Sequence, residues 1–139
     1  MPANRYVLEE NVGFILRQVT QRHLSLFSAM MVEDLTPTQF SALFKLYEQG
    51  PCSQNRLGRM TSMDNPTIKG VIDRLARRGL TSSEPDPADA RRLIVSLTRD
   101  GRAVIERAVP RAREITEATL APLSAAQRAQ FLSLLEMLK

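Results

Sequence analysis

The segment of residues 64–80, DNPTIKGVIDRLARRGL, constrains the fold most, because it holds a helix start, a helical apolar face and a stop. Asp64 or Asn65 can cap the first free amides, and Pro66 suits the first helical position. Gly79 is typical of a helix end. One apolar stripe has the spacing i, i+3, i+4 and i+7, formed by Ile68, Val71, Ile72 and Leu75. The other faces are polar and cationic, as in a helix that enters the major groove of DNA, although a solvated amphipathic helix has the same pattern.

Positive charge is concentrated around this segment. Residues 1–55 contain 4 basic and 5 acidic side chains, residues 56–113 contain 13 and 7, and residues 114–139 contain 2 and 3. The net charges are therefore −1, +6 and −1. This segregation favours a module that binds a polyanion, although charge alone does not distinguish DNA from RNA or from an acidic protein.

Length and composition indicate one domain over residues 1–139, with a core large enough to need no disulfide. The single cysteine, Cys52, fits a reducing compartment. The first residues show no basic region followed by an apolar run, and no stretch approaches the ~18 apolar residues of a membrane span. We therefore expect a cytoplasmic protein.

Before this segment, helix signals come in close succession. Residues 7–33 have helical apolar spacing, interrupted at Glu33–Asp34. A capping box at Thr36 and Gln39, with Pro37 at the first helical position, starts a helix that Gly50 ends. Ser53 can cap a shorter helix through Met60. Two short helices joined tightly, the second one basic, predict a helix-turn-helix.

After Gly79 the pattern changes to strands. Residues 81–84 and 93–97 are strand-like, and the intervening residues 85–92 form a proline-rich loop with Arg91 and Arg92. A hairpin beside a helix-turn-helix is a winged helix, although an exposed turn with solvated charges is the alternative. The predicted fold is mainly α with a small β-wing. The winged helix-turn-helix lobe spans about residues 36–98, flanked by N- and C-terminal dimerisation helices at about 7–33 and 99–139.

The C-terminal part has the pattern of two helices. Thr98 caps a long one, which Pro110 should kink because proline lacks an amide donor. Pro122 interrupts the pattern, and a capping box at Ser124 and Gln127 opens the last helix. The apolar faces of the terminal helices exceed what one small winged helix covers, so we expect a second subunit to bury them.

Three motifs stand out in this order of elements: LTPTQF at 35–40, IDRLARRGL at 72–80 and DPADAR at 86–91, the last followed by VSLTRDG at 95–101. With these motifs at these spacings, the chain resembles the MarR (multiple-antibiotic-resistance regulator) family across nearly its whole length. The resemblance implies a homodimer in which two winged helices read a palindromic duplex. Family wings often have Asp-Arg-Arg after the proline, whereas in this chain Ala90 occupies the position of the first arginine. Arg92 is a candidate to replace it.

Our DNA-binding hypothesis places the groove contacts on the basic helix and the phosphate contacts around it. Asn65 and Lys69 are able to read base edges, Arg74 and Arg77 reach phosphates, and Arg91 enters the minor groove or its edge. A structural alternative is an ion pair between Asp73 and Arg77, four residues apart. The full predicted set is Gln54, Ser62, Asn65, Pro66, Thr67, Lys69, Gly70, Arg74, Arg77, Arg91 and Arg92.

Catalytic, cofactor and metal sites are not indicated. His23 and Cys52 are the only residues of their kinds and belong to different elements, and no glycine-rich phosphate loop follows a strand. Some relatives sense peroxide with a cysteine, but they carry it in the first helix, whereas Cys52 lies in the turn before the third. Inert packing or a surface thiol is the simpler interpretation, and a redox sensor is the alternative.

The resemblance also implies an effector pocket between the first, second and fifth helices, where relatives often bind small aromatic acids. Arg17 is a candidate to meet a carboxylate, and the candidates to line the chamber are Phe14, His23, Phe40 and Phe44. As alternatives, His23 is a hydrogen-bonded interface residue and Phe40 and Phe44 are ordinary core.

The sequence therefore predicts a homodimeric, ligand-responsive repressor that binds double-stranded DNA, with half-sites about 10 bp apart. The competing hypothesis is a winged-helix module that binds an acidic protein partner through the same basic face.

Overall fold

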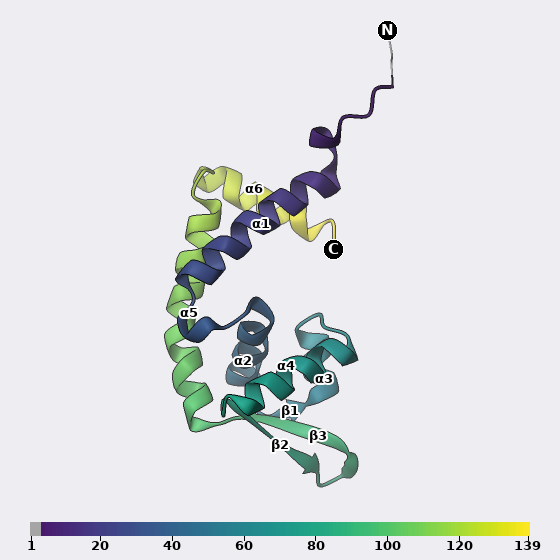
Figure 1. Cartoon of the computed structure of the whole chain (residues 1–139), viewed down its shortest axis with the longest axis vertical. Helices are drawn as coiled ribbons and strands as arrows, with labels where there is room; N and C mark the ends of the chain where they lie inside the picture. The colour runs from purple at the N-terminus through teal and green to yellow at the C-terminus, as the bar shows by residue number, and fades with distance from the viewer. Residues whose placement is uncertain (1–3) are drawn as a thin grey trace. The chain divides into compact units, whose positions relative to one another are not determined.

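The computed structural model describes residues 4–139, which divide into two compact units (Figure 1). One unit combines the residues up to Met30 with those from Arg113 onward, and the other comprises Met31–Ala112. The predicted fold class is confirmed: the chain is mainly helical, with one small antiparallel sheet.

The unit Met31–Ala112 is the winged helix-turn-helix. Its helices are α2 (Pro37–Gln49), α3 (Gln54–Met60) and α4 (Asn65–Arg77), and its strands are β1 (Cys52–Ser53), β2 (Thr81–Asp86) and β3 (Asp89–Leu97). The strand order is β1-β3-β2, and both pairings are antiparallel. The β2–β3 hairpin extends away from the three helices (Figure 1). The side chains that fill the core are almost fully buried and include Leu43, Leu57, Ile68, Leu75 and Val95.

The capping signals act as the sequence predicts. Thr36 accepts a hydrogen bond from the Gln39 amide, and the Gln39 side chain accepts one from the Thr36 amide. Ser53 caps α3, Asp64 caps α4, and Ser124 opens α6 (Ala125–Glu136) with a second capping box. Each cap satisfies amides that have no partner inside the helix, which explains why these helix starts were predictable.

The expected helix over residues 7–33 is divided into three pieces. A short 3₁₀ turn η1 (Leu8–Glu10) precedes α1 (Val12–Met30), and a second one, η2 (Val32–Asp34), follows it. Glu33 and Asp34 have φ angles of 55° and 51°, in the left-handed region that non-glycine residues seldom occupy. The helix therefore ends before this turn.

The wing differs from the prediction in two respects. Both strands are longer, so that only Pro87 and Ala88 separate β2 from β3. Their outer parts are exposed on both faces and show no apolar alternation, because backbone pairing rather than burial holds them together. In addition, Cys52 and Ser53 form a third strand paired with Val95 and Ile94, so Cys52 does not lie in a simple turn.

The other unit contains α1, the end of α5 (Arg99–Leu120) and α6. The first part of α5 belongs to the winged unit, where the Gly101 amide donates to Thr98 Oγ1 at 3.0 Å, which confirms the predicted start of the helix. Pro110 lies inside α5 and does not end it. The unit of the terminal helices exposes many large apolar side chains, among them Val12, Ile15, Leu16, Leu132, Leu134, Met137 and Leu138. Among residues 4–139 there is no helix with the length and hydropathy needed to cross a bilayer.

Candidate nucleic-acid interface and effector pocket

Helix α4 is fixed by its apolar face. Ile68, Val71, Ile72 and Leu75 are 0–3% exposed, so the opposite face is directed to solvent. At the start of the helix, Asp64 Oδ1 accepts a hydrogen bond from the Thr67 amide at 2.8 Å. Hydrogen bonding from Thr67 lowers the pKa of the Asp64 carboxyl, so the cap is ionised at neutral pH.

The predicted contact residues of α4 lie on its solvent face. Gly70 is half-buried, and the others are exposed: Asn65, Pro66, Thr67, Lys69, Arg74 and Arg77. Ser62, in the turn before α4, is exposed and has a φ of 56°. One helix and its preceding turn thus present eight of the predicted residues together.

Lys69 carries an ion pair that the sequence analysis did not anticipate. Its Nζ lies 3.1 Å from Asp73 Oδ2, one helical turn further on, whereas the alternative considered from sequence paired Asp73 with Arg77. Lys69 and Asp73 keep 67% and 46% of their side-chain surfaces exposed. An exposed pair of this kind is weak, so the Lys69 ammonium can leave Asp73 for another partner.

The wing contributes a second group of cations next to α3. A small polar pocket of about 120 Å³ is lined by Ser53, Gln54, Asn55, Arg91, Arg92 and Leu93. It brings Gln54 together with Arg91 and Arg92, which are nearly forty residues away in sequence. Asn55 is an addition to the predicted set. The only sequence signal for it is its place beside Gln54 at the start of a short capped helix.

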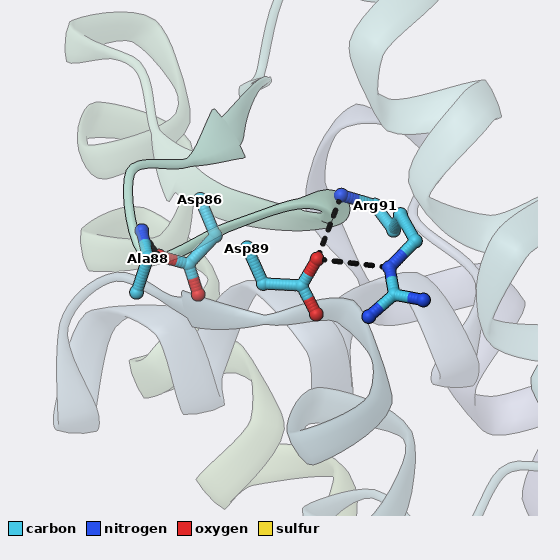
Figure 2. Close-up of polar contacts among 4 residues, drawn as sticks. All are labelled: Asp86, Ala88, Asp89 and Arg91. Atoms are coloured by element: carbon cyan, nitrogen blue, oxygen red, sulfur yellow. Dashed lines mark hydrogen bonds and ion pairs between the residues drawn. The ribbon is translucent and has the colours of Figure 1, made fainter.

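Arg91 is held by an acidic neighbour on its own strand (Figure 2). Asp89 Oδ1 accepts hydrogen bonds from the Arg91 amide at 3.1 Å and from Arg91 Nε at 3.2 Å. The hydrogen bond from the Arg91 side chain lowers the pKa of the Asp89 carboxyl, so this carboxyl is ionised at neutral pH. The Arg91 side chain is nevertheless 91% exposed, and the outer edge of its guanidinium is available to a partner.

Three of the five predicted effector residues line a pocket, and they do so in two separate pockets. His23 lines a largely apolar cavity of about 390 Å³ inside the unit of the terminal helices, together with Leu16, Val19, Thr20, Thr116, Thr119, Leu120, Phe131, Leu132 and Leu135. Its Nδ1 lies 2.8 Å from Thr119 Oγ1. Phe40 and Phe44 stack at a centroid distance of 6.1 Å beside Lys45, Met60 and Ser62, in a pocket of about 240 Å³ within the winged unit. Neither set of lining residues includes Phe14 or Arg17.

Comparison with known proteins agrees with this arrangement. A model of the MarR family matches residues 35–93. The HTH-type transcriptional repressor NicR of Pseudomonas putida is 40% identical over 131 residues, which cover 94% of this chain and 83% of NicR. The chain belongs to the MarR family.

Two solved structures of regulators are similar to this chain along nearly their whole length. A probable transcriptional regulator from Pseudomonas aeruginosa is 50% identical with a TM-score of 0.93, covering 96% of this chain and 100% of that one. BpsR of Bordetella bronchiseptica, whose DNA binding is regulated by 6-hydroxynicotinic acid, is 40% identical with a TM-score of 0.91, covering 97% of each chain. This MarR protein is therefore a DNA-binding transcriptional regulator and not an enzyme.

Two features of this MarR protein bear on the alternatives left open by the sequence: the burial of Cys52 and the position of Ala90 in the wing. Cys52 is 5% exposed, and burial raises the pKa of its thiol, which disfavours the reactive thiolate. Among residues 4–139, no three His, Cys, Asp or Glu side chains lie close enough to hold a metal ion. In the wing, Ala90 is exposed where many MarR wings have arginine, and Arg92 lies in the polar pocket beside Gln54.

Proposed function

We propose that this MarR protein is a homodimeric repressor that binds a palindromic operator and is released by a small aromatic acid. The observation that carries the DNA-binding part is the joint exposure of Lys69 on α4 and Arg91 on the wing. A helix of this shape fits the major groove, and a cationic hairpin beside it fits the flanking backbone or minor groove.

Dimerisation is supported by the surface of the terminal helices. Val12 is 64% exposed, Leu134 is 51% and Met137 is 77%, and further apolar side chains surround them in the sequence. Exposed apolar area costs ~25 cal/mol per Å² relative to burial, so a second copy that covers this face stabilises the protein. Two copies also give the two reading helices that a palindrome requires.

Repression and release are supported by relatives. NicR is named a repressor, and 6-hydroxynicotinic acid regulates the DNA binding of BpsR. We place the effector in the cavity around His23, whose apolar walls suit an aromatic ring and whose His23–Thr119 pair offers polar atoms at one point. Arg17, exposed on the same helix, is our candidate for the carboxylate, and Phe14 remains a predicted contact. Phe40 and Phe44 line the separate pocket of the winged unit and are not contacts of this cavity.

Operator binding is tested with DNA from upstream of the chain's own gene, footprinted in the presence of mixed-sequence competitor. We expect protection of a palindrome, an affinity that falls steeply with salt, and loss of protection when 6-hydroxynicotinic acid is added. Equal affinity for the palindrome and for competitor contradicts sequence-specific recognition and favours the acidic-partner hypothesis. Protection that no aromatic acid relieves contradicts only the effector.

The effector site is tested separately by replacing Thr119 with valine. This variant keeps the shape of the side chain and removes the hydroxyl beside His23 Nδ1. We expect unchanged operator affinity and a lower affinity for 6-hydroxynicotinic acid by isothermal titration calorimetry. Ser25→Ala is a matched control, because it also removes one hydroxyl, from an exposed residue of α1 that does not line the cavity.

A further inference from the structure

The C-terminal end of α4 is attached to neighbouring elements by an arginine outside the predicted contact set. Arg78 Nη2 donates a hydrogen bond to the backbone oxygen of Glu33 in η2. Its Nη1 lies 3.5 Å from Gln39 Oε1 on α2. The same Gln39 oxygen accepts from the Thr36 amide, so this guanidinium joins the end of α4 to the capping box of α2.

The acceptor turn is itself held in place. Glu33 has a left-handed backbone, and its Oε1 lies 2.9 Å from Arg107 Nη2 on α5. Gln39 is 8% exposed, so its side chain has little freedom to move. Arg78 therefore bonds to two groups whose positions are already determined by other elements of the winged unit.

This attachment matters because a groove-reading helix needs an accurate angle as well as a buried face. The apolar stripe of α4 fixes how deep the helix sits, but packing alone permits small tilts about that face. Base contacts tolerate displacements of only about 0.5 Å. A fork of two donors at the far end opposes such tilting, since the guanidinium is planar and directs its N–H groups in fixed directions.

We propose that Arg78 is a positioning residue for DNA recognition, which holds the C-terminal end of α4 against η2 and α2 and so sets the angle of its base-reading half. The inference rests on the proposed operator binding. It assigns different roles to two adjacent arginines, both of which are exposed: Arg77 is a predicted phosphate contact, whereas the Arg78 guanidinium is hydrogen-bonded to Glu33 and Gln39 of the same protein.

The test compares Arg78→Gln with Arg77→Gln, which remove the same charge from neighbouring residues. Dissociation constants are measured for the operator and for mixed-sequence DNA over a range of salt, at a temperature where circular dichroism shows each variant folded. For Arg78→Gln we expect operator binding about tenfold weaker, because α4 loses the charged hydrogen bonds that hold its angle for base contacts. Mixed-sequence binding, which does not depend on base contacts, should stay within about twofold of the parent. Its salt dependence on mixed-sequence DNA should equal that of the parent.

Arg77→Gln should behave differently. Both affinities should fall, and the slope of log K against log salt should decrease by about 0.9 for each phosphate that the variant no longer neutralises. A purely structural role for Arg78 would lower the thermal midpoint without changing the ratio of the two affinities in the folded protein. The ratio is thus the deciding measurement.

Arg78→Lys supplies the second variant. It keeps the charge, but one ammonium cannot reproduce the two directed donors, so the operator preference should remain below that of the parent. The proposal is overturned if Arg78→Gln keeps the parental preference, if its salt slope decreases as that of Arg77→Gln does, or if lysine restores full preference. Should Arg78→Gln unfold, the preference of Arg78→Lys decides. A parent protein without operator preference would instead refute the proposed function.

Discussion

At the scale of single residues, Arg91 combines firm local support with exposure. Asp89 holds its amide and Nε, and the rest of the guanidinium is open to solvent. Replacing Arg91 by alanine should weaken binding to operator and mixed-sequence DNA alike and decrease the salt slope by about 0.9 for each phosphate left without its cation. Fluorescence anisotropy with labelled duplexes measures both quantities.

The control for Arg91→Ala is Arg5→Ala, which removes the same charge from an exposed position outside the basic middle of the sequence. It should leave the slope unchanged. Arg91→Ala that binds with the parental slope would contradict the assignment of the wing to DNA.

Cys52 illustrates how burial decides between two chemistries. Its pKa is raised above the usual 9.0 by desolvation, which outweighs the attraction of nearby Arg56. In the folded protein, alkylation by iodoacetamide at pH 8 should be much slower than in urea, since the thiolate is the reactive form. Because unfolding lowers this pKa, the free energy of unfolding should decrease as pH rises above about 9.

Peroxide provides the functional check on Cys52. Cys52→Ala should bind operator like the parent, and treatment of the parent with peroxide should leave binding unchanged. Release of DNA by peroxide in the parent, but not in Cys52→Ala, would establish the redox-sensing alternative.

At the scale of secondary-structure elements, the junction between α4, β2 and α5 depends on a close backbone approach. Gly79, just after the end of α4, has a φ of 71°, and the Leu80 amide donates back to the Leu75 oxygen at 3.0 Å. The Leu80 oxygen in turn accepts from the Thr98 amide at 3.1 Å. A Cβ atom on Gly101 would lie 1.9 Å from that oxygen, a distance that only movement of α5 could relieve.

Gly101→Ala should therefore destabilise the fold by about 3 kcal/mol or more, as overpacking against backbone does. Urea denaturation followed by circular dichroism measures the destabilisation. Gly70→Ala is the matched control, because its Cβ would meet only the flexible end of Arg74, at 3.5 Å, in the middle of a helix. That variant should gain about 0.5–1 kcal/mol.

Elements with a local cause were predictable, and those with a distant cause were not. The starts of α2, α3, α4 and α6 follow from side chains that accept hydrogen bonds from amides three residues further on. Strand β1 is only two residues long and exists because β3 pairs with it, which nothing near Cys52 indicates. Likewise, the outer wing strands are held by mutual backbone bonds, and their exposed residues carry no alternating pattern.

The candidate site follows the same division. The solvent face of α4 could be read from its apolar stripe, because burying one side of a helix determines the other. The meeting of Gln54 with Arg91 and Arg92 depends on the pairing of β3 with β1, and the role of Arg78 depends on Glu33 and Gln39. Sequence spacing of about forty residues gives no signal for either contact.

At the scale of the whole molecule, recognition of a palindrome needs two copies held at a fixed separation. The terminal helices expose apolar side chains that the core of their own unit does not bury. Leu134→Glu places a charge on this face, and burying an unpaired carboxylate in an interface is costly. We expect the variant to elute as a monomer by size-exclusion chromatography with light scattering, whereas the parent elutes as a dimer.

Ser133→Glu is the matched control, since it adds the same charge to the adjacent exposed residue of α6 and removes no apolar side chain. It should remain dimeric.

Leu134→Glu should keep its helical circular dichroism and a weak affinity for a single half-site, because the winged unit has its own core. It should lose the preference for a full palindrome.

Inserting 5 bp between half-sites should strongly weaken the binding of the parent protein, since half a helical turn places the second half-site on the opposite face of the duplex. The monomeric variant should be indifferent to the same insertion. A parent that is also indifferent would mean that each subunit binds alone, and the apolar face would then require a different occupant.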